Sequence, residues 1–216
     1  MAKRNYQNNY SSVTQILAVL RKIGLESWFK ANTAEFCNRK SSLGKKIGSE
    51  IHNSIEQYIK TGSAKVESEH PEEVTNALNS FILFRKENPL IQLSLAETPL
   101  TSEQYQYNGT IDALSPPMLC DWKSGEAKDK EKPVIYDEAK SQVAAYVHLW
   151  NENNLDNQIL TAHIVALAKD KIAYNIYTME KEEIDEWFNE VFLSALKIKN
   201  YETKQKQLKK EKKNAV

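Results

Sequence analysis

Two aspartates and a lysine stand close together in the stretch 107–125, YNGTIDALSPPMLCDWKSG. Proline cannot donate to the centre of a β-ladder and it stiffens turns, so the Ser-Pro-Pro segment predicts a reversal between two short strands. A reversal centred between the two prolines places Asp112 opposite Asp121, with Cβ atoms roughly 5 Å apart on one face. Lys123 lies two residues beyond Asp121, and strand alternation puts it on that face as well.

Opposed carboxylates repel each other and destabilise a plain hairpin. A divalent cation between them converts the repulsion into a binding site, because Mg²⁺ and Mn²⁺ favour carboxylate oxygens. An adjoining ammonium group can hold a water molecule or a phosphate oxygen beside that ion. The pattern therefore outlines a site for phosphodiester hydrolysis. The alternative is a solvent-facing hairpin with a charged edge, but the apolar neighbours favour a central pair of strands, where unpaired carboxylates are costly.

The segments GTIDAL and CDWKSG resemble the acidic core of the PD-(D/E)XK nuclease superfamily, in particular its RecB-type exonuclease branch. Within that branch the chain is similar to the single-strand exonucleases of mitochondrial genome maintenance and to their phage relatives. The resemblance implies an α/β fold of the restriction-endonuclease type. We expect a central mixed sheet of about five strands, flanked by helices, with an N-terminal helical subdomain.

A strong amphipathic helix is predicted from Gly44 to Lys60, where isoleucines recur at four-residue spacing. His52 lies beside this apolar stripe, and a lone histidine on a helix is usually structural. The resemblance implies a second role. RecB-type nucleases carry a G-x-x-x-H helix whose histidine ligates the catalytic metal, and the segment from Gly48 to His52 matches it.

Another matching motif follows the D-x-K strand. Gln142 and Tyr146 lie four residues apart on one face of a helix predicted from Tyr136 to Asn151. A polar residue beside a core tyrosine needs no function, but the family has a Q-x-x-x-Y helix in this place. By that resemblance Gln142 orients Lys123 or the scissile phosphate, and Tyr146 contacts the DNA backbone.

The residues before the hairpin are predicted to be mostly helical. One helix is expected to begin at the serines of 11–14 and to end near Gly24, and a second to run from Leu25 to Cys37. A strand candidate at 91–97 ends on Glu97, which is either a surface residue or, as in some relatives, part of the site. The expected organisation is a single structural domain. Its parts are an N-terminal helical region over residues 1–90 that covers the active site, a nuclease core over 91–200 and a basic flexible tail over 201–216.

The composition bounds the class of protein. With 216 residues, 41% hydrophobic and 27% charged, the chain is typical of a soluble globular protein. It has no apolar run approaching about 18 residues and no secretory h-region, so we expect a cytoplasmic location (host cytoplasm if viral) and no membrane partner. Cys37 and Cys120 are too few for a disulfide scaffold or a zinc ribbon. Related CRISPR-associated nucleases hold an iron–sulfur cluster through four cysteines, so no iron–sulfur cluster is expected.

The net charge of zero conceals three blocks of different sign. Residues 1–61 carry 10 basic and 4 acidic side chains, residues 62–196 carry 11 and 23, and residues 197–216 carry 8 and 2. An acidic body with basic ends suits a metal site near DNA-contacting segments. Solvated lysines on exposed helices fit the same counts.

These features predict a metal-dependent DNA exonuclease that acts on the ends of single-stranded DNA in repair, recombination or phage DNA processing. The expected site comprises four catalytic residues (Asp112, Asp121, Lys123, Gln142), four ligands of Mg²⁺ or Mn²⁺ (His52, Asp112, Asp121 and the Trp122 carbonyl), and two DNA contacts (Gln142, Tyr146). The alternatives are a structure-specific endonuclease of the same superfamily and a non-catalytic, nuclease-like DNA-binding module. The intact Asp–Asp–Lys set argues against the second alternative.

Overall fold

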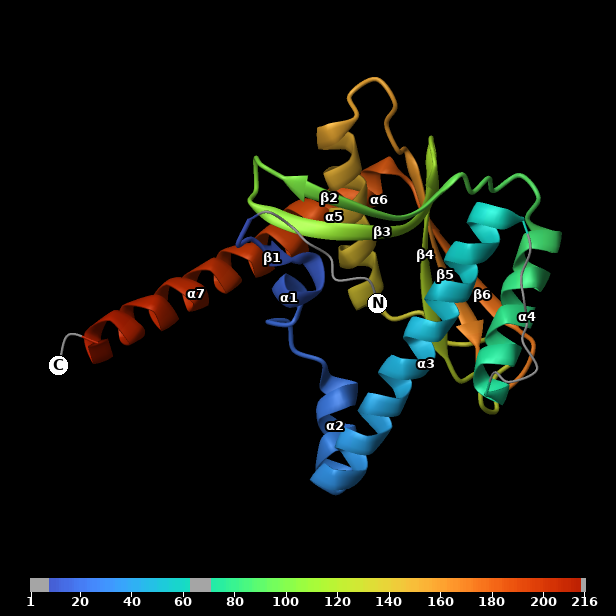
Figure 1. Cartoon of the computed structure of the whole chain (residues 1–216), viewed down its shortest axis with the longest axis horizontal. Coiled ribbons are helices and arrows are strands. Elements are labelled where there is room, and N and C mark those ends of the chain that lie inside the picture. The colour runs from blue at the N-terminus through green and yellow to red at the C-terminus, as the bar shows by residue number, and fades with distance from the viewer. Residues whose placement is uncertain (1–7, 63–70, 215–216) are drawn as a thin grey trace.

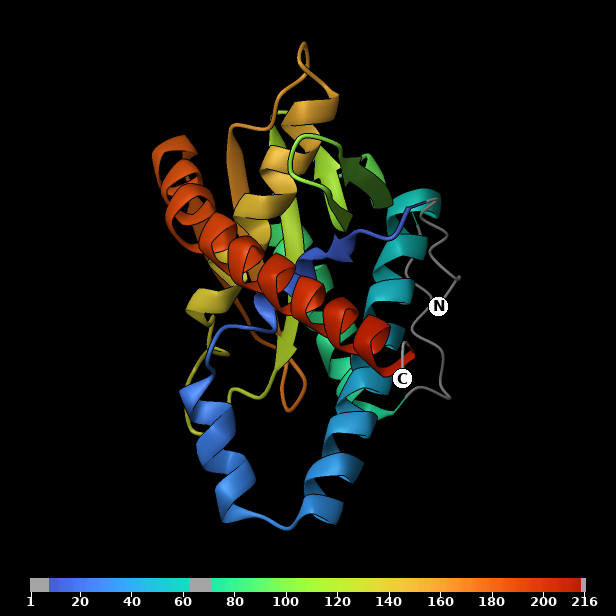
Figure 2. The ribbon, with the colours of Figure 1, turned by 90° about the vertical axis from the view of Figure 1, so that its left-hand side faces the viewer.

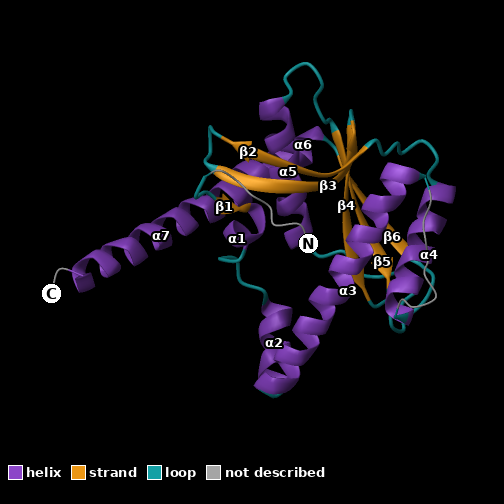
Figure 3. Ribbon diagram, viewed as in Figure 1, coloured by secondary structure: helices purple, strands orange, loops and turns teal. Residues whose placement is uncertain are grey.

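A mixed β-sheet lies between two layers of helices in this α/β structure (Figures 1 and 3). The structure is a computed structural model and describes residues 8–62 and 71–214. Within those residues the sheet has six strands. In spatial order they are β1 (Ser11–Ser12), β3 (Tyr107–Ser115), β4 (Met118–Gly125), β5 (Thr161–Ala168) and β6 (Tyr174–Met179), with β2 (Leu95–Ser102) also paired to β3. The β1–β3 and β4–β5 pairs are parallel, and the other pairs are antiparallel.

The helices lie on both faces of this sheet. They are α1 (Val13–Leu17), α2 (Ile23–Ala31), α3 (Ala34–Thr61), α4 (Glu72–Glu87), α5 (Asp137–Asn153), α6 (Lys181–Glu186), the π-helical turn η1 (Trp187–Phe192) and α7 (Leu193–Asn214). Helices α3 and α4 cover one face, and α1, α5 and η1 cover the other. Within the described ranges, no helix has the length and apolarity needed to cross a lipid bilayer.

Each face of the sheet has its own hydrophobic core. On the α3–α4 face, Trp122 of β4 meets the rings of Phe81 and Phe84 edge-on, with centroids 5.3 and 5.8 Å away. On the α5 face, Tyr107 packs against Phe192 at 4.9 Å, and its hydroxyl donates to the Ala145 carbonyl at 2.9 Å. Because both faces are covered, most residues of β3 and β5 are buried, as are Leu119 to Trp122 in the middle of β4.

The β3–β4 hairpin reverses at Pro116 and Pro117, as the sequence predicts. Its ladder pairs Ser115 with Met118, and two further pairs follow in the same register. Continued by one step, that register sets Asp112 opposite Asp121. The ladder stops there, because the Trp122 N–H donates to Asp112 Oδ2 at 2.9 Å. A side chain thus takes the place of a strand-to-strand hydrogen bond.

Helix α5 lies against β3 at a glycine. A Cβ atom at Gly109 would meet Leu149 Cδ2 at 2.7 Å and the ring of Tyr146 at 3.0 Å, closer than carbon atoms normally approach. The absence of a side chain at this position therefore sets how near α5 comes to the sheet.

The N-terminal region differs from the sequence prediction in three ways. It contributes β1 to the sheet, which explains six strands in the described chain where about five are expected. The first helix starts after an N-cap at Ser12, as predicted. It ends at Leu17 and not near Gly24, and its apolar residues Val13, Ile16 and Leu17 are all buried in the core. Gly24 accordingly lies inside α2, and a break at Thr33 separates α2 from α3.

The C-terminal region also differs from the expected flexible tail. Residues 201–214 are helical and continue α7 without a break, because lysine, glutamine and glutamate are strong helix formers. The charged loop after β4 is held against the β5–β6 connection by hydrogen bonds. The N–H groups of Ala127 and Lys128 donate to the Asp170 carboxylate at 2.9 and 2.8 Å, and Lys171 donates to two carbonyls of the loop.

Candidate active site

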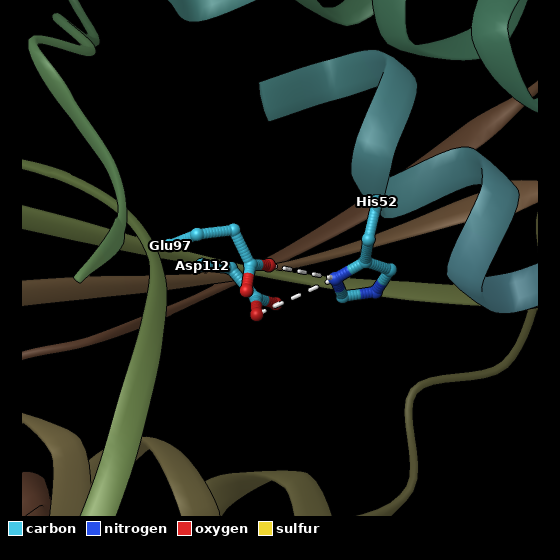
Figure 4. A group of neighbouring side chains, drawn as sticks. All are labelled: His52, Glu97 and Asp112. Atoms are coloured by element: carbon cyan, nitrogen blue, oxygen red, sulfur yellow. Dashed lines mark ion pairs between the residues drawn. The ribbon is translucent and has the colours of Figure 1, made fainter. Parts of the chain in front are cut away.

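Helix α3 carries His52 to the sheet. Ile47, Ile51 and Ile55 form a buried stripe at four-residue spacing that seats the helix on the α3–α4 core. His52 follows Ile51 directly, so its side chain emerges at the border of that stripe. The side chain points toward β2 and β3 and keeps 28% of its surface exposed (Figure 4). The apolar packing of α3 thus fixes the direction of a polar side chain.

Three side chains meet at this point, and we call them the ligand cluster: His52, Glu97 and Asp112. His52 Nδ1 lies 3.4 Å from Asp112 Oδ1 and 3.8 Å from Glu97 Oε1 (Figure 4). The other oxygen of Asp112 accepts the N–H of Trp122. One nitrogen and two carboxylate oxygens therefore converge from a helix and two strands.

Glu97 reaches the cluster through an unusual backbone conformation. It occupies the place in β2 opposite Asp112, between the paired positions Ala96–Ala113 and Thr98–Ile111. Its φ of 47° lies in the left-handed region, which is uncommon for a residue with a side chain. Such conformations carry strain and concentrate at functional sites. The ladder is interrupted where Glu97 faces Asp112, the two residues whose carboxylates approach His52.

Four further side chains form a second group, which we call the lysine cluster: Asp121, Lys123, Gln142 and Tyr146. Lys123 Nζ approaches Asp121 Oδ2 to 2.5 Å as an ion pair and donates to Gln142 Oε1 at 3.1 Å. The Gln142 amide donates to Asp121 Oδ1 at 3.4 Å and to the Tyr146 hydroxyl at 3.0 Å. Gln142 therefore joins β4 to α5 and holds the lysine in one direction.

The two aspartates have pKa values displaced in opposite directions. Complete burial raises the pKa of Asp121 to about 6, with Lys123 opposing the rise and Asp112 adding to it. Burial also acts to raise the pKa of Asp112, but His52, Lys123 and the Trp122 N–H outweigh it, so that this pKa falls below its ordinary value. Burial acts to lower the pKa of His52, whereas the charge of Asp112 and hydrogen bonds to Asp112 and Glu97 raise it to about 10. Paired groups with separated pKa values are typical of catalytic sites.

The ligand cluster has the donor set of a divalent-cation site. Its three ligand atoms lie within 4.8 Å of one another. Carboxylate oxygens suit Mg²⁺ and Mn²⁺, and an imidazole nitrogen moves the preference toward Mn²⁺. A proton on His52 balances the carboxylates in the bare cluster. A cation can supply the same balance with the imidazole neutral, so the residues present fit a metal.

A cavity of about 640 Å³ opens beside the lysine cluster. Gln142 and Glu138 of α5 form one wall, and residues of the segment 14–29 form the other. That second wall is largely apolar, with Leu17, Leu20 and Phe29. Its charged residues are Lys22 and the ion pair of Arg21 with Glu26. The cavity thus borders the side chain that holds Lys123.

The structure brings together most of the side chains that the sequence singles out. His52 contacts Asp112, which accepts the N–H of Trp122. Asp121, Lys123, Gln142 and Tyr146 are linked to one another in a second set. The distribution differs from the expected one, because Glu97 rather than Asp121 stands with His52 and Asp112. The sequence leaves Glu97 as either a surface residue or part of the site, and its position opposite Asp112, which only the β2–β3 register reveals, places it beside His52.

Comparisons with known proteins found similarity in structure alone. No family model and no curated protein matches the sequence. Among solved structures, an alkaline exonuclease from Laribacter hongkongensis is 12% identical, with a TM-score of 0.44, 93% of this chain covered and 94% of that one. A phage-related exonuclease from Haemophilus somnus is 13% identical, with a TM-score of 0.37 and coverages of 71% and 81%. Structural similarity at these TM-scores does not establish an activity, which depends on the residues of the site.

Proposed function

We propose that this chain is a metal-dependent DNA exonuclease with a restriction-endonuclease-like core of the RecB type. The observation that carries the proposal is the nearness of two complementary groups on one hairpin, close enough for the charge of Lys123 to lower the pKa of Asp112 and for Asp112 to raise that of Asp121. The ligand cluster presents one nitrogen and two carboxylates within 4.8 Å, and the lysine cluster holds an ammonium group beside it. A metal site with an adjacent, oriented lysine is suited to the hydrolysis of a phosphodiester.

His52, Glu97 and Asp112 would hold Mg²⁺ or Mn²⁺, with Asp121 and the Trp122 carbonyl as further ligands. A bound cation supplies a water of lowered pKa and offsets negative charge on the phosphate. The chain provides the orientation. An ammonium group has three donors, and Asp121 and Gln142 take two of the directions around Lys123 Nζ. The remaining donor is free to position the attacking water or a phosphate oxygen, while Tyr146 fixes Gln142.

Preference for the end of a single strand is supported by the cavity beside Gln142. A strand that reaches Lys123 through this cavity passes between α5 and the segment 14–29, whose apolar wall suits unpaired bases better than a stacked duplex. The products would be a 5′-phosphate and a 3′-hydroxyl. Involvement in repair, recombination or phage DNA processing belongs to the same proposal.

The test compares linear and covalently closed circular single-stranded DNA of the same sequence, each incubated with Mg²⁺ or Mn²⁺. We expect progressive shortening of the linear strand, no cleavage of the circle, and no activity in EDTA. The Lys123→Ala variant serves as the inactive control for contaminating nucleases. Comparable loss of the circle would replace the exonuclease with a structure-specific endonuclease. Absence of cleavage on every substrate, with DNA still bound, would instead favour a non-catalytic DNA-binding module.

A further inference from the structure

Helix α7 leaves the body of the protein after its first turn. Ala195 and Leu196 are buried, whereas nearly every residue from 197 to 214 is exposed. Figure 1 shows the helix extending away from the sheet, and in Figure 2, turned by 90°, it runs across the front of the molecule on the side that faces the viewer. At about 1.5 Å per residue the exposed part is roughly 27 Å long. Packing within the described chain therefore does not explain why this segment is present.

The charge of this exposed helix opposes that of the body. Residues 197–216 carry 8 lysines and 2 glutamates, whereas residues 62–196 carry 11 basic and 23 acidic side chains. A polyanion is repelled by most of such a surface and attracted to the helix. The arrangement concentrates positive potential on one protruding element.

The lysines are not spread evenly around the helix. At about 100° per residue, five of them fall within one third of the circumference, and we call this face the lysine stripe. Three others lie on the opposite face, beside the exposed apolar residues Tyr201 and Leu208. The stripe consists of Lys199, Lys206, Lys209, Lys210 and Lys213, and the opposite lysines are Lys197, Lys204 and Lys212.

Helix α1 lies between the candidate active site and this helix. Its residues Thr14 and Leu17 line the cavity beside Gln142, and the same helix packs against the base of α7. A nucleic acid that leaves the cavity over α1 therefore meets the lysines of α7 next. From Lys199 to Lys213 the stripe spans about 21 Å, which corresponds to about six phosphates of one strand at 3.4 Å each.

We propose that the lysine stripe of α7 binds the phosphate backbone of the DNA that extends beyond the active site, without regard to sequence. The inference rests on the proposed function for the identity of the polyanion. The lysine stripe increases the affinity for long strands only, because a strand too short to leave the cavity cannot reach α7.

The experiment compares two variants of equal charge. One replaces Lys206, Lys210 and Lys213 of the stripe by glutamine, and the matched control replaces Lys197, Lys204 and Lys212. Binding of a labelled single-stranded oligonucleotide long enough to span site and helix is measured by anisotropy without divalent metal, between about 50 and 200 mM salt. Glutamine preserves helix propensity, and circular dichroism checks the helix content.

We expect the stripe variant to reduce the slope of log affinity against log salt by about 2, and the control by less than 1. Equal slopes for both variants and the unaltered protein would overturn the proposal, as would an equal reduction in both variants. Loss of binding to phosphatidylserine vesicles with an unchanged DNA slope would overturn it in favour of a membrane surface. Because cleavage is not the readout, failure of the proposed nuclease activity leaves this result interpretable.

Discussion

The ligand cluster and the lysine cluster face each other across one hairpin, yet their internal chemistry differs. Each contains an aspartate of the same central pair of strands. Asp112 lies among a histidine, a glutamate and a backbone N–H, and its pKa is lowered. Asp121 is fully buried beside a lysine and an amide, and its pKa is raised to about 6.

The difference indicates a division of labour. In the ligand cluster, oxygen and nitrogen atoms converge with one exchangeable proton between them, so that cluster is suited to binding a cation. In the lysine cluster, the contacts of Gln142 form a chain that ends on Lys123 Nζ, so that cluster is suited to directing a donor. Substitutions in the ligand cluster should change the affinity for the cation, and substitutions in the lysine cluster should change kcat.

The largest effect is expected from Lys123→Ala. Loss of an oriented donor to the reacting phosphate should lower kcat by about 100- to 1000-fold, with an unchanged metal midpoint. Turnover of a linear strand at saturating Mn²⁺ measures it, and Lys128→Ala, whose side chain is 73% exposed, is the control. Asp121→Asn should have a similar effect, and the double variant should lose little more, because residues of one unit are not additive. Near-normal turnover in either single variant would remove the lysine cluster from the chemistry.

A smaller effect, and on a different quantity, is expected from His52→Ala and Glu97→Gln. Each removes a donor from the ligand cluster, so the Mn²⁺ concentration for half-maximal activity should rise by about 10- to 100-fold while much of kcat returns at saturation. The increase in Tm caused by Mn²⁺ or Ca²⁺ should shrink in parallel.

Glu56→Gln is the matched control on α3, because Glu56 pairs with Lys60 one turn further along the helix and outside the cluster. If His52→Ala and Glu97→Gln titrate with Mn²⁺ like the unaltered protein, the cation does not bind at the ligand cluster, and the division between the two clusters fails.

The smallest effect is expected from Tyr146→Phe. The change removes only the hydroxyl that accepts from the Gln142 amide. A neutral hydrogen bond contributes about 1 kcal/mol, so kcat should fall about fivefold without a shift in the metal midpoint. Tyr201→Phe on exposed α7 is the control, and an effect of Tyr146→Phe on metal affinity instead would show that the clusters do not act separately.

The sequence predicts the parts of the site that depend on local geometry. The prolines set the register of the hairpin, and with it the placement of Asp112 opposite Asp121. Likewise, the four-residue spacing of isoleucines defines the buried face that directs His52. Glu97 depends on pairing between β2 and β3 and on a left-handed backbone that no residue type in its segment requires.

The sequence does not predict the limits of the N-terminal elements, for a related reason. The two residues of β1 pair with a strand almost a hundred positions later, and a hydrophobic pattern does not encode such a partner. The amphipathic pattern of Val13, Ile16 and Leu17 indicates a helix that packs on the core. The pattern does not indicate the residue at which that helix ends. Long-range pairing, rather than local propensity, decided these boundaries.

The close seating of α5 on Gly109 has a consequence for how loss of activity is interpreted. Tyr146 both touches the space above this glycine and accepts from Gln142, so a methyl group at position 109 would press on the chain of contacts that ends at Lys123. A residue with no functional group thereby affects the placement of the tyrosine that supports Gln142. A loss of activity on substitution at position 109 would therefore report displacement of Tyr146, and not a chemical role of the residue itself.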